Sequence, residues 1–410
     1  MFPNFIYINI VFQCCNTQKG RNVLYFNAKK SMKQGAIIRI YCNFALYTHV
    51  LNETRIKKQI TKMKKNLFIL ALLLCITLGA SAQKKFNLYA VGFYNQENLF
   101  DTCHDEGKRD YDFLPNGSYK WNGLKYTHKL RNMAQAIADL GTDKLPGIGC
   151  AIVGMSEVEN SKVLDDLTAQ APLKQRGYKY VHVEGPDRRG IDCAMLYNPR
   201  FFTVKDVRLV PYVPEEPKDS NFITRGFLTV SGTLAGEPVA VIVCHWPSRF
   251  TTSYYREVAG RQVRAVKDSL LRANKKCKVF VMGDMNDDPT NKSMTEALSC
   301  KPTIEKTGKD DMYNPWYNLL TKQGKGTLFY NGTWNLFDQI VMTPNLLNAN
   351  GSKDFSTLKY FQHQIHIRPY LIQSEGRYKG APKRTTAGGV WLDGYSDHLP
   401  VVVYLVKEQK

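Results

Sequence analysis

Five short polar motifs, each at the end of an apolar stretch, constrain this chain more than any other feature of its sequence. They are YNQENL at 94–99, SEVEN at 156–160, CHWPS at 244–248, GDMNDD at 283–288 and SDHLP at 396–400. Four of the five follow a strand-like stretch, so we expect their carboxylate, carboxamide and imidazole groups at strand ends. Such groups can ligate a hard divalent cation and form an acid–base pair, and together they are suited to phosphoester hydrolysis.

Residues 63–82 have the order of a secretory signal peptide. A basic start precedes an apolar run at 67–78, and small residues follow it. The run is shorter than the roughly 20 residues that a membrane-spanning helix needs. We therefore expect cleavage after Ala82, a secreted or periplasmic product, and no stable membrane insertion. A membrane anchor and a lipoprotein anchor at Cys75 are the alternatives.

The position of this signal makes residues 1–62 unexpected, because a signal peptide works at the N-terminus. We interpret 1–62 as a spurious or disordered upstream extension, read from an incorrect start codon. A genuine cytoplasmic leader with an internal Met63 is the alternative, and N-terminal sequencing of the product separates the two. The remaining residues, 83–410, are enough for one large α/β domain.

Charge and cysteine content narrow the function only slightly. The formal net charge is +20, but part of the excess lies upstream of residue 83. A basic surface suits an anionic polymer or membrane face, although many secreted proteins are as basic without binding either. No cysteine after residue 82 lies in a C-x-x-C pair or has zinc-site spacing. A disulfide between Cys277 and Cys300 is conceivable, but the sequence assigns no pairs.

The apolar pattern predicts an α/β domain. Because several strands follow one another directly, the sheet should be mixed. We expect the polar segment 351–389 to be a long excursion over the surface. Strands are predicted over 86–94, 151–155, 178–183, 191–197, 201–210, 222–230, 238–244, 278–282, 336–342 and 399–406, and helices near 130–138 and over 161–170 and 252–273.

Acidic residues at the ends of strands are the candidates for a metal site. Glu157 ends an apolar strand and is the best single candidate ligand, although a role at the start of a helix is the alternative. Asp284 and Asn286 follow another strand, where a carboxylate and a carboxamide together can orient a nucleophilic water. An Asx-rich turn is the alternative for this pair.

Two histidines at the edges of apolar runs suggest acid–base chemistry. His245 and His398 are far apart in the chain, and Asp192 and Asp338 are candidate carboxylate partners for their imidazoles. The sequence contains neither a G-x-S-x-G elbow nor a Walker-type glycine loop. Covalent serine hydrolysis and nucleoside-triphosphate motors are therefore poorly supported.

The motifs in this order resemble the endonuclease/exonuclease/phosphatase family, whose members share the fold of pancreatic-type deoxyribonuclease. The resemblance covers essentially residues 86–406. It implies a single-domain α/β fold, a four-layer α-β-β-α sandwich of two packed mixed sheets. The residues that carry it are Asn95, Glu157, His245, Asp284 with Asn286, Asp338, and Asp397 with His398.

The resemblance also implies roles for individual residues. Glu157 matches the metal-ligating glutamate. Glu97, near the metal, and Asp397, an additional site carboxylate, are expected to ligate the metal with it. Asn95 matches the asparagine of the first motif and is expected to bind substrate. Asp284 and Asn286 match the pair that handles the attacking water and the scissile phosphate.

Further matches concern the histidines and arginines. His398 matches the phosphate-contacting histidine, paired with Asp338. His245 matches the second histidine of the deoxyribonuclease-like and phosphatase branches, with Asp192 as its expected partner. The resemblance places Arg225 where members carry a phosphate-binding arginine. Arg189, in a basic turn, is expected to bind substrate as well.

The function expected from these matches is metal-dependent phosphodiester hydrolysis, most simply by a monomeric nuclease. The cofactor expected is Mg²⁺ or Mn²⁺, with Ca²⁺ as a further option, and water attacks in line. A phosphatase or phosphodiesterase acting on small or lipid phosphoesters, such as sphingomyelin, is the alternative enzyme. A non-catalytic binding module on the same fold is the alternative outside enzymes, although all the motif residues are present.

Overall fold

The computed structural model describes residues 14–16, 22–24, 58–70, 84–216, 221–349 and 351–409. The chain divides into two compact units, Met1–Gln83 and Lys84–Lys410, and each is considered by itself. In the first, β1 (Cys14–Asn16) pairs antiparallel with β2 (Asn22–Leu24), and residues 58–70 are helical. The expected cleavage point after Ala82 and most of 1–62 lie outside the described residues. No helix in the described ranges is both long and apolar enough to span a bilayer.

The first sheet of the second unit has six strands, with two parallel strands at its centre. β3 (Phe86–Leu99) runs parallel to β4 (Ile152–Val158), and the other pairs in the sheet are antiparallel. The order is β16 (Lys359–Ile365), β19 (Val401–Glu408), β3, β4, β6 (Asp192–Tyr197) and β5 (Lys179–His182).

The second sheet has seven strands. β9 (Glu237–His245) runs parallel to β10 (Lys278–Asp284), and β10 pairs antiparallel with β15 (Asp338–Met342). The expected mixed sheet is therefore confirmed twice over. The order is β11 (Cys300–Lys301), β12 (Met312–Tyr313), β15, β10, β9, β8 (Phe227–Leu234) and β7 (Phe202–Val210).

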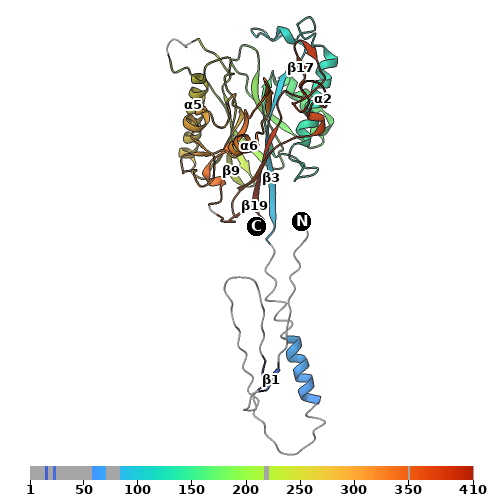
Figure 1. The fold of residues 1–410 in the computed structure, drawn as a ribbon, viewed down its shortest axis with the longest axis vertical. Coiled ribbons are helices and arrows are strands. Elements are labelled where there is room, and N and C mark those ends of the chain that lie inside the picture. Colours follow the sequence, from blue (N-terminus) through green and yellow to red (C-terminus); the bar gives the residue numbers. More distant parts are fainter. Residues whose placement is uncertain are drawn as a thin grey trace, which may run out of the picture. The chain divides into compact units, whose positions relative to one another are not determined.

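Apolar side chains join the two sheets face to face. Phe93, Met195 and Met282 are fully buried in the core between them. Helix α2 (Gly123–Asp139) covers the outer face of the first sheet, and α5 (Ser253–Ala273) covers the second, so the two helices lie on opposite outer sides (Figure 1). The four-layer α-β-β-α sandwich is confirmed. Helices α3 (Ser161–Ala169) and α4 (Ala171–Lys174) complete the layer of α2.

The local sequence explains where the helix over the first sheet lies. The side chain of Asn122 accepts a hydrogen bond from the Lys125 amide and caps the start of α2. Leu130, Met133 and Ile137 recur at helical spacing and are buried against the sheet. The amphipathic pattern therefore predicts this helix, although its observed start lies before the first apolar residues of the repeat.

The segment 351–389 differs from the expected surface excursion. Residues 359–365 form the edge strand β16, which pairs with β19 through a β-bulge. Further along, β17 (Thr386–Ala387) and β18 (Val390–Trp391) form a two-stranded ribbon. The edge strand is only half-buried, which explains its weak apolar pattern. The short elements α6 (Tyr317–Gln323), β13 (Leu328–Tyr330) and β14 (Thr333–Asn335) precede it.

Candidate active site

The second sheet brings three candidate residues side by side at the ends of its strands. Asp284 is the last residue of β10, where it lies opposite His245 of β9 and Asp338 of β15. The parallel pairing of β9 with β10 leaves no room beside Gly283, where an added Cβ would lie 2.2 Å from the Cys244 carbonyl oxygen. A glycine is therefore needed for the close approach of these two strands.

The first sheet contributes the facing half of the site. Asn95 of β3 pairs in register with Ser156 of β4, and the ladder is interrupted directly afterwards, at Glu157. Backbone in the left-handed region is uncommon for non-glycine residues and often marks a functional site. At this site positive φ values occur at Glu97 (46°), Asn98 (57°), Glu157 (61°) and Asn286 (49°).

Glu157, His245 and Asp284 form a group suited to a metal ion. One carboxylate oxygen of each acid and one ring nitrogen of His245 all lie within 4.8 Å of one another. The Nε2 atom of His245 lies 3.8 Å from Glu157 Oε1 and 3.7 Å from Asp284 Oδ2. The Asn95 amide donates to both carboxylates, at 3.4 Å and 3.0 Å. Glu157, the expected metal ligand, therefore lies beside His245, expected in acid–base chemistry, and Asn95, expected to bind substrate.

The protonation states fit this interpretation. Burial, followed by the positive charges of Arg225 and Arg189, lowers the pKa of His245 well below its usual range, so the ring is neutral and can ligate a metal. Burial raises the pKa of Asp284 to about 7, with His398 opposing the shift and Asp338 adding to it. Two crowded carboxylates beside a neutral imidazole are a donor set that fits a divalent cation.

His398 is held by Asp338, as expected from the sequence. The Nδ1 atom of His398 lies 2.6 Å from Asp338 Oδ2, and its Nε2 atom lies 3.8 Å from Asp284 Oδ2. Burial disfavours the charged ring, but Asp338 and Asp284 outweigh it and raise the pKa of His398 well above its usual range. The neutral ring of His245 and the protonated ring of His398 therefore lie near the same Asp284 oxygen, at 3.7 Å and 3.8 Å.

Asn286 and Arg225 converge on the carbonyl of Trp246. The Asn286 amide donates to this oxygen at 2.9 Å, and Arg225 Nη2 donates to it at 3.0 Å. Arg225 is buried and pairs with Asp187, at 3.0 Å. Arg189 is half-exposed and donates its backbone amide to the same aspartate, at 2.9 Å. Asp187, which the sequence analysis missed, therefore positions both predicted arginines.

Two of the expected metal ligands have other partners. Both carboxylate oxygens of Glu97 accept hydrogen bonds, at 2.6 Å from the Thr385 amide and at 3.3 Å from Arg384 Nε. Asp397 accepts a hydrogen bond from Arg384 Nη2 at 3.0 Å. Neither acid belongs to the group around Glu157. Their assignment as metal ligands stays a prediction, and in this structure both carboxylates pair with the Arg384 guanidinium.

Asp192 does not pair with His245, contrary to the expectation. Its Oδ2 atom lies 3.2 Å from His182 Nε2 and accepts a hydrogen bond from the Gly185 amide at 3.1 Å. These contacts fix the beginning of the loop that carries Asp187 and Arg189. The correction has a simple cause, because Asp192 begins β6 and His182 ends the neighbouring strand β5, so the imidazole within reach is that of His182. Asp192 therefore supports the site through this loop and not through an imidazole of the site.

The sequence analysis also missed Arg384, Thr385 and Lys129. Lys129 is buried in α2, where its ammonium group donates to the Thr385 hydroxyl at 2.5 Å and to the Tyr395 carbonyl at 2.7 Å. A lysine at a buried position of the helical repeat was the one signal available for this cluster. Arg384 and Thr385 lie in a polar segment with no periodic pattern, so nothing local indicated them.

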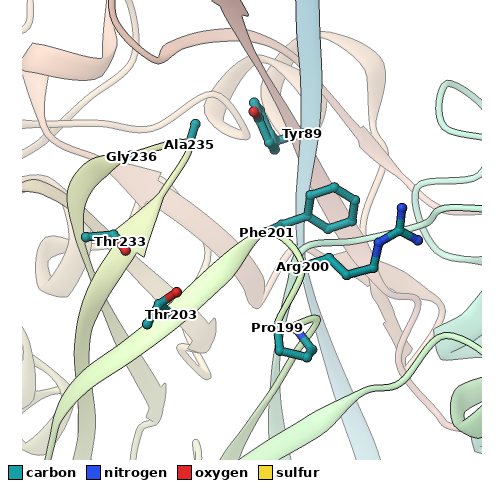
Figure 2. Close-up of a pocket in the computed structure, with 8 residues that line it drawn as sticks. All are labelled: Tyr89, Pro199, Arg200, Phe201, Thr203, Thr233, Ala235 and Gly236. Atoms are coloured by element: carbon teal, nitrogen blue, oxygen red, sulfur yellow. The ribbon is translucent and has the colours of Figure 1, made fainter.

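A hollow of about 200 Å³ lies at the other end of the sheets and is lined by Tyr89, Arg200, Phe201 and neighbouring residues (Figure 2). Tyr89 precedes Asn95 by six residues of one strand, which corresponds to about 20 Å. The lining residues include no carboxylate and no histidine. We therefore assign the chemistry to the strand ends around Asp284.

Comparisons with known proteins agree with the fold. The model of the Endonuclease/Exonuclease/phosphatase family matches residues 90–407. No curated protein sequence matches the chain.

Several solved structures are similar in fold. An endonuclease/exonuclease/phosphatase family protein from Bacteroides thetaiotaomicron is 16% identical, with a TM-score of 0.48, over 79% of this chain and 97% of that one. The mannosyl-6-phosphatase of the same organism is 17% identical, with a TM-score of 0.47, over 77% and 99%. D. rerio TDP2 complexed with single-strand DNA product is 14% identical, with a TM-score of 0.44, over 78% and 98%. Likeness at this level says nothing about the substrate.

The family model spans most of the length of the chain. The chain therefore belongs to the endonuclease/exonuclease/phosphatase family, whose members are metal-dependent phosphoester hydrolases.

Proposed function

We propose that this protein is a secreted hydrolase of phosphodiester bonds that uses Mg²⁺ or Mn²⁺ and acts on nucleic acid. The supporting observation is the meeting of Glu157, His245 and Asp284 within 4.8 Å, with His398 and its partner Asp338 alongside. The proposal of secretion rests on the signal-like pattern of residues 63–82.

Glu157, Asp284 and His245 would hold the divalent ion. When bound, the ion stabilises the negative charge that develops on the phosphoryl oxygens during in-line attack. Magnesium prefers oxygen ligands and manganese tolerates an imidazole, so the presence of His245 makes both ions reasonable candidates.

The remaining residues supply binding and proton transfer. His398, kept protonated by Asp338, is placed to donate a hydrogen bond to a phosphate oxygen or a proton to the leaving oxygen. The Asn286 backbone amide donates to Asp284 at 2.9 Å and fixes the carboxylate that would orient the attacking water. Arg225 and Arg189 provide positive charge near His245.

One observation favours a small or lipid phosphoester as the second candidate substrate. Three partly exposed arginines at this end of the sheets are each paired with an acid, which offsets part of their positive charge. Arg189 lies 3.9 Å from Asp187, Arg249 lies 2.9 Å from Asp288, and Arg384 lies 3.0 Å from Asp397. A long nucleic-acid track would gain more from unpaired basic residues.

A substrate screen tests both candidates. Purified protein is incubated with plasmid DNA, RNA, bis-p-nitrophenyl phosphate and sphingomyelin, with and without EDTA, beside an identically purified Glu157→Gln variant. Cleavage of DNA or RNA that is lost with EDTA and in the variant supports the nuclease. Turnover of only bis-p-nitrophenyl phosphate or sphingomyelin supports the second candidate. Inactivity on all four in the presence of Mg²⁺ or Mn²⁺ would overturn the proposal.

A further inference from the structure

The guanidinium of Arg384 lies between two acids of the site. Its Nε atom lies 3.3 Å from Glu97 Oε1, and its Nη2 atom lies 3.0 Å from Asp397 Oδ2. These two carboxylates come from motifs about 300 residues apart, and each was expected to ligate a metal. The positively charged guanidinium of Arg384 therefore occupies the position in which these two carboxylates could otherwise share a metal ion.

The base of the ribbon β17–β18 holds Arg384 in this position. The Thr385 amide donates to Glu97 at 2.6 Å, so the backbone beside the arginine is tied to β3. The Tyr395 amide donates to the Lys383 carbonyl at 2.6 Å and closes the ribbon. The two arms of the ribbon pack so closely that an added Cβ at Gly394 would lie 2.1 Å from the Arg384 carbonyl oxygen. The position of the guanidinium is thus set by backbone contacts as well as by its ion pairs.

Arg384 is also close to the reacting groups. Asp397, which it contacts, lies 3.9 Å from His398 Nε2. Glu97, its other partner, donates its backbone amide to the Asn95 side chain at 2.9 Å, and Asn95 in turn contacts Asp284. The Arg384 side chain remains 44% exposed although Glu97 is only 3% exposed. It therefore reaches from the buried acids to the surface of the site.

We propose that Arg384 binds the substrate phosphate and takes the place of a second metal ion, so that the active site holds a single divalent ion. The inference rests on the proposed phosphoesterase function and names the residue that sets how the phosphate is held. Nε and Nη2 face the two acids, and no hydrogen bond from Nη1 occurs in the described part of the chain. An arginine fork can hold a carboxylate on one side and a phosphate oxygen on the other.

A purely structural ion pair is the competing explanation. Exposed pairs of this kind contribute little to stability, and loss of such a pair would leave ion binding and substrate affinity unchanged. Arg208 offers a matched control, because its Nε atom pairs with Asp206 at 2.7 Å on β7 and its side chain is 65% exposed. Arg208→Met removes an arginine–aspartate pair outside the site.

The first experiment counts bound ions. Equilibrium dialysis with Mn²⁺ and electron paramagnetic resonance of the free ion are applied to wild type, Arg384→Met, Arg384→Lys and Arg208→Met. We expect one ion in wild type, Arg384→Lys and Arg208→Met, and a second, weaker ion in Arg384→Met, where the two acids lose their cation. Circular dichroism confirms that each variant is folded. Two ions in wild type, or a single ion in a folded Arg384→Met, would overturn the inference.

The second experiment separates binding from turnover. For Arg384→Met we expect KM for bis-p-nitrophenyl phosphate to rise about tenfold, the scale of one charge-assisted hydrogen bond, with a smaller change in kcat. Arg384→Lys should recover part of the loss, and Arg208→Met should match wild type. An unchanged KM in Arg384→Met would refute the substrate contact. Wild type that binds no Mn²⁺ and turns over no phosphoester would instead overturn the proposed function itself.

Discussion

Asp338 and His398 meet across two strand ends, with Asp338 Oδ2 2.6 Å from His398 Nδ1. Asp338 begins β15, whereas His398 lies just before β19 of the other sheet. The pair therefore bridges the two halves of the sandwich at the site. The Ser396 hydroxyl assists by accepting from the His398 amide at 3.1 Å and donating to the Asn95 carbonyl at 2.8 Å.

Replacement of Asp338 by asparagine should move the pH profile of the enzyme. Asp338 raises the pKa of His398, so the stabilisation from this ion pair is present at low pH and is lost as pH rises through the raised pKa. In Asp338→Asn that pKa falls, and the high-pH loss of activity should shift to lower pH. We also expect kcat/KM to fall by about 10²–10⁴ at neutral pH. A pH–rate profile identical to that of wild type would show that the pair is only structural.

Substitutions of Glu157 and of Asn160 should have separate effects, the first on ion binding and the second on the stability of a capped helix. The N-cap of α3 is Asn160, whose side chain accepts from the Val163 amide at 3.1 Å, whereas Glu157 accepts from the Asn98 amide. Glu157→Gln should therefore weaken Mn²⁺ binding and turnover strongly with little loss of stability. Asn160→Ala should cost about 0.5–2 kcal/mol of unfolding free energy and leave ion affinity unchanged. Calorimetric titration measures ion affinity and urea unfolding measures stability. If Asn160→Ala weakened Mn²⁺ binding and Glu157→Gln only lowered stability, the assignment would be reversed.

The sequence predicts those parts of the site that are set by local structure. Glu157, His245 and Asp284 each follow a run of apolar residues, and the chain turns sharply just after each run. Strand ends in a sandwich meet at one edge, so side chains from remote motifs converge there without any detail of the loops. The pairing of Asp338 with His398 followed from the family order of the motifs.

The contacts that the sequence could not predict depend on which strands are neighbours or on the path of a loop. Asp192 pairs with His182 because β5 and β6 are neighbours, which the separate strand patterns do not reveal. Arg384 reaches Glu97 across 287 positions of the chain. Its segment is polar and has no period, so a surface loop was the simplest expectation. Long-range pairings of this kind carry no signal in one sequence.

Asp139 should make stability depend on acid pH. Partial burial opposes its charge, but hydrogen bonds from Arg368, Thr142 and Tyr370 hold the pKa of Asp139 below its usual range. A depressed pKa contributes stability above the unfolded value of about 3.9, and this stability is lost as pH falls through the folded pKa. Asp139→Asn should therefore be less stable than wild type at pH 7, and the difference should shrink at low pH.

Thermal unfolding of wild type and Asp139→Asn from pH 7 down to pH 3 measures this difference. Asp206→Asn, which disrupts an exposed pair with Arg208, is the control and should have almost the same midpoint as wild type throughout. A difference in unfolding midpoint between wild type and Asp139→Asn that stays constant with pH would indicate that the substitution removes packing contacts and not a charge.

Gly283 should be among the least replaceable residues of the second sheet. An alanine Cβ there would lie 2.2 Å from the Cys244 carbonyl oxygen, which is backbone of the adjacent strand and cannot rotate away. Gly283→Ala must therefore separate β9 from β10, at a cost of about 1–3 kcal/mol or more, and displace His245 from Asp284. Gly123→Ala is the matched control, because no atom lies within 4 Å of its added Cβ. Gly123 begins α2, so this change should leave stability equal or raise it by up to about 1 kcal/mol. Urea unfolding and Mn²⁺ affinity measure both variants, and a Gly283→Ala protein with wild-type stability and ion binding would show that the strands are less tightly apposed than this register requires.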